Sequence, residues 1–230
     1  MPASVPASAP GSVTVAMLLA DARLPSGGHA HSAGMEPAIL GGLPVAEVPA
    51  FLIGRARTTS LVEAGSAVVA RRYALDGRGL APVVRAWAAR TPSPAMRDAS
   101  RVLGRGYLRL AARTWPASAA LRTLSAAPEA PPRALVLGAI AAAAGMSAED
   151  LVRLTVYDEA HSAAAALLKL EPRDPADGIR WVLDACASVE HLVPLLAELT
   201  TPDAIPAAGA PQAEGWAEAH ALMNQRLFRA

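Results

Sequence analysis

The sequence has few cysteines, lysines and aromatic residues, and each shortage excludes a class of site or fold. One cysteine, Cys186, occurs in 230 residues, which excludes an internal disulfide and supplies too few thiols for a cysteine metal cluster. Lys169 is the one lysine among 21 basic residues, and the net charge of +1 argues against a nucleic-acid binder held by bulk electrostatics. Aromatic residues make up 4% of the chain, so alanine and the aliphatic residues must fill the core, a composition that favours helices over sheets.

Long apolar runs are missing too. None reaches the ~20 residues that a membrane-spanning helix needs, and the longest, 134–148, predicts a buried core helix. Residues 1–20 are interrupted by prolines and lack a cationic segment before an apolar one, so they do not resemble a signal peptide. We expect a cytoplasmic protein without membrane contact, in which residues 1–12 form a flexible tail and residues 13–230 form one domain.

Apolar residues recur at helical spacing throughout, and no strand alternation is convincing. The pattern predicts an all-α fold, a single-domain bundle of about nine to eleven helices. Prolines and glycines divide the chain into the segments 13–22, 33–41, 46–58, 60–75, 80–90, 95–113, 117–126, 132–144, 148–169, 177–199 and 212–227. Pro194 should kink or end the helix predicted over 177–199, because proline lacks the N–H that a helix interior needs.

A glycine-rich loop, residues 24–36, separates two apolar segments. His29 and His31 in this loop could be metal ligands, but a metal site normally needs at least one more ligand. The glycine pair does not form a phosphate-binding P-loop, because Lys169 is followed by leucine.

The segment 96–111 carries arginines at every fourth position, from Arg97 to Arg109. This spacing forms a slowly winding ridge on a helix, and a solvated face is the simplest interpretation. Ser100 and Gly104 form a small-residue notch that lets another backbone come close. Gly106 costs about 1 kcal/mol relative to alanine in a helix, so we expect a packing reason or a break there.

The C-terminus, residues 224–230, gathers arginine, leucine and phenylalanine at an end that would ordinarily fray. Arginine and aromatic residues dominate protein interfaces, so this segment could anchor a partner. Alternatively, a final helix docks here on its own core.

No serine nucleophile elbow and no marked catalytic triad occur, so the sequence does not indicate an enzyme. Three classes remain open: an interaction protein, a helical ligand-binding or regulatory domain, and a metal-dependent hydrolase that uses His29 and His31. The first is favoured by the absent catalytic motifs and by the composition of the C-terminus.

Three motifs together resemble the UreF family of urease accessory proteins. Residues 21–36 are similar to that family's opening signature of leucine-proline, a glycine pair, His-Ser and a glutamate. Residues 97–104 resemble its middle motif, and Arg226-Leu-Phe-Arg229 resembles its terminus. The matches lie near the beginning, middle and end, so the resemblance covers nearly the whole chain.

The resemblance implies an all-helical, non-catalytic urease maturation factor that is usually a homodimer. Such a protein bridges a UreD/UreH-type scaffold and the UreG-type GTPase to support nickel insertion into apo-urease, without a cofactor or metal of its own. The chain departs from the family at His29, in 131–138 and after Leu170, so those regions inherit no role. The matching residues form the expected partner-binding or structural signature: Pro25, Gly27, Gly28, His31, Ser32, Gly34, Glu36, Arg97, Ser100, Gly104, Arg226, Leu227, Phe228 and Arg229.

Overall fold

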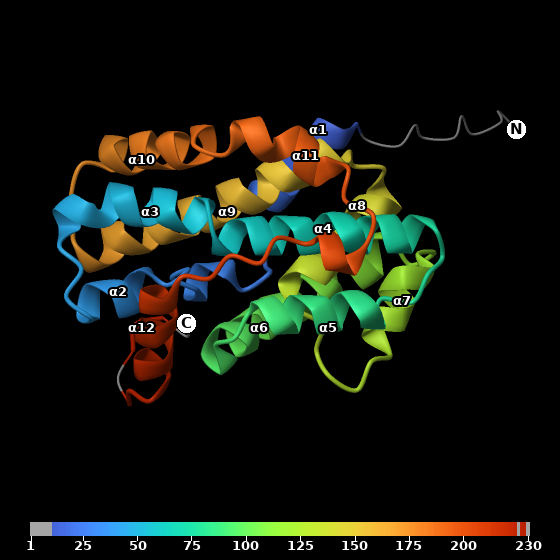
Figure 1. Ribbon diagram of the computed structural model, residues 1–230, viewed down its shortest axis with the longest axis horizontal. Coiled ribbons are helices and arrows are strands. Elements are labelled where there is room, and N and C mark those ends of the chain that lie inside the picture. Colours follow the sequence, from blue (N-terminus) through green and yellow to red (C-terminus); the bar gives the residue numbers. More distant parts are fainter. Residues whose placement is uncertain (1–10, 225, 229–230) are drawn as a thin grey trace, which may run out of the picture.

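The structure is a computed structural model that describes residues 11–224 and 226–228. Within these residues the fold is all-α as predicted, with twelve α-helices, four short 3-10 turns and no strand (Figure 1). The α-helices are α1 (Ser12–Ala20), α2 (Met35–Leu40), α3 (Val48–Ala56), α4 (Thr59–Leu75), α5 (Ala81–Arg90), α6 (Pro94–Thr114), α7 (Ala119–Ser125), α8 (Arg133–Ala144), α9 (Ala148–Leu170), α10 (Pro175–Ala187), α11 (Val193–Ala197) and α12 (Pro211–Ala221). The predicted tail lies outside the described residues except for Gly11 and Ser12, and Ser12 already begins α1.

Each of the eleven predicted segments contains a helix, and the twelfth α-helix arises where proline interrupts the chain. The segment predicted over 177–199 is divided into α10 and α11, and Pro194 lies in the first turn of α11. Its missing N–H costs little there, which confirms the expected effect of this proline. The helix predicted over 212–227 was too long, because α12 ends at Ala221.

Local caps explain several boundaries. The Ser147 hydroxyl accepts a hydrogen bond from the Asp150 N–H at 3.0 Å, which caps the start of α9. Gly145 ends α8 in the left-handed conformation that glycine favours. The side chain of Ser93 likewise accepts a hydrogen bond from the Met96 N–H and starts α6.

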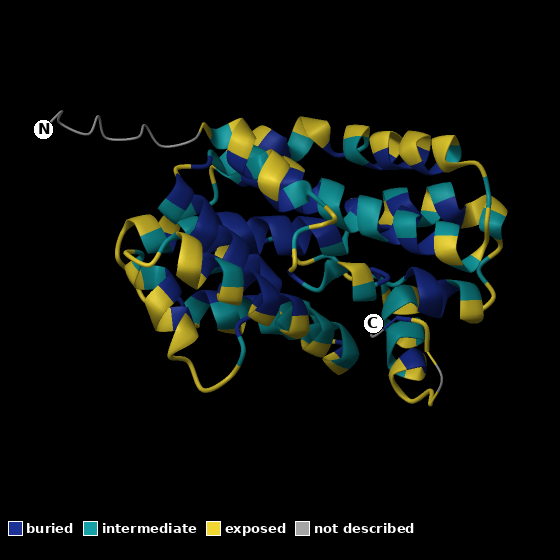
Figure 2. Cartoon of the chain, turned by 180° about the vertical axis from the view of Figure 1, so that it is seen from behind, coloured by how far each residue is buried: buried dark blue, intermediate teal, exposed yellow. Residues whose placement is uncertain are grey.

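Helices α4, α8 and α9 form the centre of the fold, with α6 packed on α8 and α10 packed on α9. Ten of the twelve residues of α8 are buried, so the apolar run is a core helix as predicted. A Cβ at Gly138 of α8 would lie 2.3 Å from the Ala67 carbonyl oxygen, so glycine permits the close approach of α8 to α4. Buried residues are concentrated in the interior of the molecule, whereas the surrounding helices show exposed outer faces (Figure 2).

Helix α12 packs against α2 and α6 and brings the end of the chain next to the glycine-rich loop (Figure 1). None of the helices described is both long enough and apolar enough to cross a bilayer. The position of α12 joins the first and last sequence motifs at one end of the molecule.

Candidate functional site

The glycine-rich loop is held against α6 by close backbone contacts. A Cβ at Gly106 of α6 would lie 1.7 Å from the Ser26 carbonyl oxygen, so no side chain fits between helix and loop. Arg109 of α6 donates a hydrogen bond to the Pro25 carbonyl oxygen at 3.0 Å. Gly106 therefore has the packing reason expected from the sequence, and α6 continues through it without a break.

Two glycines of this loop have left-handed backbone conformations, Gly27 at φ +91° and Gly34 at φ +81°. Side chains rarely tolerate these angles. At Gly34 a Cβ would also lie 2.9 Å from Nη1 of Arg55, so glycine leaves room for that guanidinium. The loop residue His31 is partly buried, and Ser32 is fully buried.

Glu36 of α2 joins the loop to the end of the chain. Its Oε1 accepts a hydrogen bond from the Leu227 backbone N–H at 2.7 Å, and its Oε2 accepts one from the Phe228 N–H at 2.9 Å. Nε2 of His220 lies 2.9 Å from the same Oε2. Glu36 is 3% exposed, so a buried carboxylate fixes the path of the C-terminal segment. Helix α12 ends at Ala221, and the N–H groups of Leu227 and Phe228 bond to Glu36, so this segment does not continue the helix.

The C-terminal segment presents its side chains in two directions. Phe228 is 4% exposed and packs in the core, with the Lys169 ammonium 5.2 Å from its ring centroid. Leu227 is 63% exposed, and Arg226 is exposed as well. Arg229, the last residue of the predicted signature, lies outside the described residues. Phe228 therefore docks on the protein's own core, which was the alternative interpretation of this segment, while Arg226 and Leu227 face outward.

The middle motif has a structural function in this arrangement. Arg97 donates hydrogen bonds from Nη1 to the carbonyl oxygens of Thr91 and Pro92, which holds the loop between α5 and α6 against the start of α6. The Ser100 hydroxyl accepts a hydrogen bond from the Arg133 backbone N–H at 3.1 Å. A Cβ at Gly104 would lie 2.0 Å from the Pro131 carbonyl oxygen, which confirms the predicted small-residue notch.

The arginine ridge of α6 is only partly a solvated face. Arg97 and Arg109 bond to backbone carbonyl groups, and Arg101 forms an exposed ion pair with Glu129 at 3.4 Å. Arg105 is exposed. The interpretation as a solvated face therefore holds for Arg105 and Arg109, which are exposed, although Arg109 also holds the glycine-rich loop. It was wrong for Arg97, which is partly buried and holds the loop before α6.

A buried ionic network beneath the middle motif was missed from the sequence. Arg133 of α8 is 4% exposed, and its Nη1 and Nη2 lie 2.6 Å and 2.9 Å from the carboxylates of Asp158 and Glu159. Nη2 of Arg55 lies 3.4 Å from Glu159, and Nε of Arg133 lies 3.9 Å from Glu63. Arg133 directly precedes the apolar run 134–148 in the sequence, and only the packing of α3, α4, α8 and α9 reveals its partners.

The members of this network have different protonation preferences. Burial raises the pKa of Glu63, although the nearby Arg133 opposes the shift, and burial also raises the pKa of Asp158. For Glu159 burial acts in the same direction, but the charges of Arg133 and Arg55 outweigh it and lower the pKa. Burial disfavours the charged form of Arg133, yet the surrounding carboxylates raise its pKa. The Arg133–Glu159 pair is therefore ionised, while Glu63 more readily takes up a proton.

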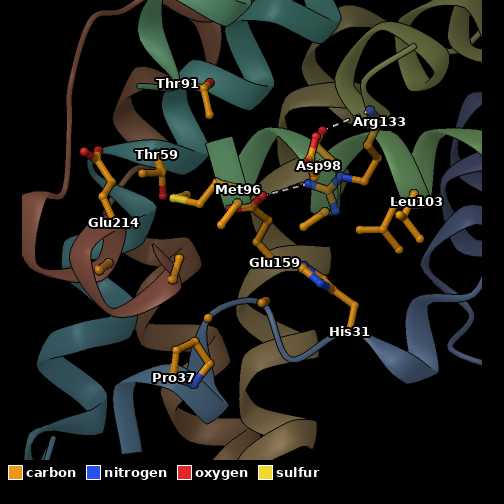
Figure 3. A pocket seen from close by; sticks show the side chains of 18 of the residues that line it. His31, Pro37, Thr59, Thr91, Met96, Asp98, Leu103, Arg133, Glu159 and Glu214 are labelled. Carbon is orange, nitrogen blue, oxygen red and sulfur yellow. Dashed lines mark hydrogen bonds and ion pairs between the residues drawn. The ribbon is translucent and has the colours of Figure 1, made fainter. Parts of the chain in front are cut away.

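A cavity of about 280 Å³ lies between this network, the glycine-rich loop, α6 and α12. Figure 3 shows His31 on the side of the loop, Met96 and Asp98 on the side of α6, and Glu159 next to Arg133 on the inner side. Arg226 lines the same cavity, which therefore lies beside the C-terminal segment.

The two loop histidines line different spaces. His29 is exposed and lines a smaller cavity of about 60 Å³, whereas His31 lines both cavities. His161 also lines the smaller cavity, although it is distant in the sequence. Over the described part of the chain, no group of three or more histidine, cysteine or acidic side chains has the geometry to hold a metal ion.

The structure brings most of the predicted signature together. Pro25 meets α6, Glu36 meets the C-terminal segment, and Gly34 lies against Arg55 of α3. The notch residues Ser100 and Gly104 contact the start of α8 and the loop before it. Gly28 begins a short 3-10 turn and does not need a left-handed conformation.

Comparison with known proteins gives a consistent result. A sequence model of the UreF family matches residues 45–186. A urease accessory protein UreF of Mycobacterium marinum is 43% identical over 168 residues, which cover 71% of this chain and 76% of that protein. Proteins of the same description from Mycobacterium sp. strain JLS and Mycolicibacterium vanbaalenii are 38% and 37% identical, over 72% of this chain and 76% and 77% of their own.

Proposed function

This chain belongs to the UreF family of urease accessory proteins, and from this premise we propose that it is a non-catalytic adaptor in urease maturation. In this role it bridges a UreD/UreH-type scaffold protein and a UreG-type GTPase and supports nickel insertion into apo-urease. Membership of the family supports a role in urease maturation. The two partners and the support of nickel insertion are what we propose beyond that role. We further propose that it acts as a homodimer.

The adaptor proposal rests on the hydrogen bonds by which Glu36 holds the C-terminal segment. One buried carboxylate binds two backbone N–H groups of the C-terminal segment and links it to the loop. Arg226 and Leu227 are thereby held outward in a fixed position. Holding a segment in its binding conformation lowers the entropy lost on association, so this arrangement favours partner binding.

The surface around Glu36 and the C-terminal segment has the composition of a protein–protein interface. Leu222 is 86% exposed and Leu227 is 63% exposed, and Leu40 at the end of α2 is also exposed. Exposed apolar groups beside an arginine are typical of protein contact sites. We propose that this end of the molecule, defined by Leu40, Leu222, Arg226 and Leu227, contacts the scaffold protein.

Co-expression with UreD-type and UreG-type proteins, followed by size-exclusion chromatography, tests the proposal. Arg226→Gln/Leu227→Gln should weaken scaffold binding by about tenfold or more, because it removes an arginine and an apolar anchor. Arg72→Gln/Leu75→Gln is the matched control, since it changes an exposed arginine and leucine at the end of α4.

Truncation of residues 224–230 provides a second comparison and should weaken the complex as well. If the folded full-length chain binds neither partner, the adaptor proposal fails. If the double variant binds as tightly as the control, the assignment of the contact surface fails. Light scattering during the same chromatography tests the homodimer, and the mass of a single chain would contradict it.

A further inference from the structure

The proposed adaptor role does not account for the cavity between the loop, α6 and α12. Its volume of about 280 Å³ is close to the lower end of the range for small-molecule sites, ~300–1,000 Å³. Its walls are mainly apolar and include Val62, Met96 and Leu103, while its inner side carries charged groups. Apolar walls with a few convergent polar groups are the usual composition of a ligand site.

Among the buried charged groups that line this cavity, Arg55 uses the smallest part of its hydrogen-bonding capacity. A guanidinium has five N–H donors. Among the described residues, the one ion pair of Arg55 is a long contact of 3.4 Å from Nη2 to Glu159. Its side chain is 10% exposed, so bulk water can reach little of it. Arg133, in contrast, has close contacts to both Asp158 and Glu159.

The fold keeps Arg55 available to the cavity. Gly34 has no side chain to cover Nη1, where a Cβ would approach to 2.9 Å. The Phe51 ring lies on another side, with its centroid 5.9 Å from the guanidinium carbon. A buried cation with unused donors beside an open space favours a ligand that brings hydrogen-bond acceptors.

The neighbouring acids do not cancel this preference. Glu159 is already bound by Arg133 at 2.9 Å and by the Ser60 hydroxyl at 2.7 Å. Glu63 accepts a hydrogen bond from the Trp87 indole and, because burial raises its pKa, it favours the neutral form more than an exposed glutamate does. Asp98 and Glu214 also line the cavity; Asp98 lies 3.6 Å from Arg101, and Glu214 accepts a hydrogen bond from the Ala210 backbone N–H. Each acid of the cavity therefore already has a partner.

We infer that this cavity binds a carboxylate attached to a compact apolar group, with the carboxylate on Arg55 and the apolar group between α6 and α12. The ligand is a small organic acid or the C-terminal carboxylate of a peptide, which share this chemistry. The inference does not rest on the proposed function, since the isolated chain contains every group that it invokes.

Three probes with one aliphatic chain test the inference: hexanoate, hexanamide and hexylammonium. Their chains of seven or eight non-hydrogen atoms are small ligands, as a cavity of about 280 Å³ requires. Titration of the full chain, followed by NMR and calorimetry, should give saturable binding of hexanoate, about tenfold weaker binding of hexanamide and none of hexylammonium. Absent hexanoate binding, or a preference for the ammonium, overturns the inference.

Variants locate the site. Arg55→Gln should weaken hexanoate about tenfold while hexanamide changes little, and Arg180→Gln on the exposed surface of α10 is the control. Ala99→Leu adds volume to the cavity wall without removing a charge, so it should block both probes and remains informative if Arg55→Gln does not fold. Unchanged hexanoate binding in the folded Ala99→Leu variant overturns the location.

A dipeptide ending in leucine, with a free or an amidated C-terminus, distinguishes the two sources of the carboxylate. Tighter binding of the free dipeptide than of hexanoate assigns the site to a chain end of a partner. Tighter binding of hexanoate assigns it to a free organic acid. Equal binding of the free and amidated dipeptides, together with equal binding of hexanoate and hexanamide, contradicts carboxylate recognition.

Discussion

Replacing Glu36 by glutamine should release the C-terminal segment while the rest of the fold remains intact. The two carboxylate oxygens face three donors, the N–H groups of Leu227 and Phe228 and Nε2 of His220. A glutamine amide has one oxygen and one NH2 group, so in either orientation its NH2 group faces at least one N–H group. The variant therefore loses at least one hydrogen bond to a buried charged acceptor.

The magnitude follows from these contacts. A hydrogen bond to a charged group contributes about 1.5–3 kcal/mol. Because 1.4 kcal/mol corresponds to a factor of ten, the population in which the segment is undocked should rise by about ten- to a hundredfold. Global stability should change less, since the undocked N–H groups can bond to water.

Amide hydrogen exchange measured by NMR tests this prediction at Leu227 and Phe228. Both amides should exchange about ten- to a hundredfold faster in Glu36→Gln, whereas amides in the buried helix α8 should keep their wild-type rates. Glu47→Gln is the control, because it is the same substitution at an exposed position in the short 3-10 turn before α3. Exchange at Leu227 and Phe228 within about twofold of wild type would refute the reasoning.

Three further substitutions test the interior. Gly106→Ala should destabilise the chain by about 1–3 kcal/mol in urea unfolding, because its Cβ would meet the Ser26 carbonyl oxygen; an unchanged midpoint contradicts the packing argument. Arg133→Met should cost about 3–5 kcal/mol in the same assay, because it leaves buried carboxylates such as Glu159 unpaired; a neutral effect contradicts the importance of the network. Burial raises the pKa of Tyr107 to about 12 from its usual 10, so between these pH values the folded state retains a proton that the unfolded state loses. The free energy of unfolding of the wild type should therefore fall by about 2–3 kcal/mol as the pH rises from 10 to 12. In Tyr107→Phe this part of the loss should be absent, and equal losses in the two proteins contradict the argument.

The sequence predicted the helices well, because their signals are local. Apolar spacing, the cap at Ser147 and the left-handed glycine at position 145 each depend on a few adjacent residues. Pro194 was correctly expected to interrupt its segment for the same reason. The end of α12 was predicted too late: the chain after Ala221 includes Leu227 and Phe228, whose N–H groups bond to Glu36, a partner far away in the sequence.

The candidate site was predicted only in part. The motifs identified the loop, Glu36 and the C-terminal segment, and the notch at Gly104 followed from residue size alone. Their junction at Glu36, and the inward and outward directions of Phe228 and Leu227, could not be predicted from spacing. These features depend on how α12 packs against α2 and α6.

Helix periodicity and motifs are properties of neighbouring residues, so the amino-acid sequence was enough to predict an all-helical chain with a glycine-rich loop and a family resemblance. The packing of remote helices was needed to show that Arg133 is surrounded by Glu63, Asp158 and Glu159, and that Arg55 faces a cavity. A buried charge acquires its partners from helices that are remote along the chain, so its environment is set by packing.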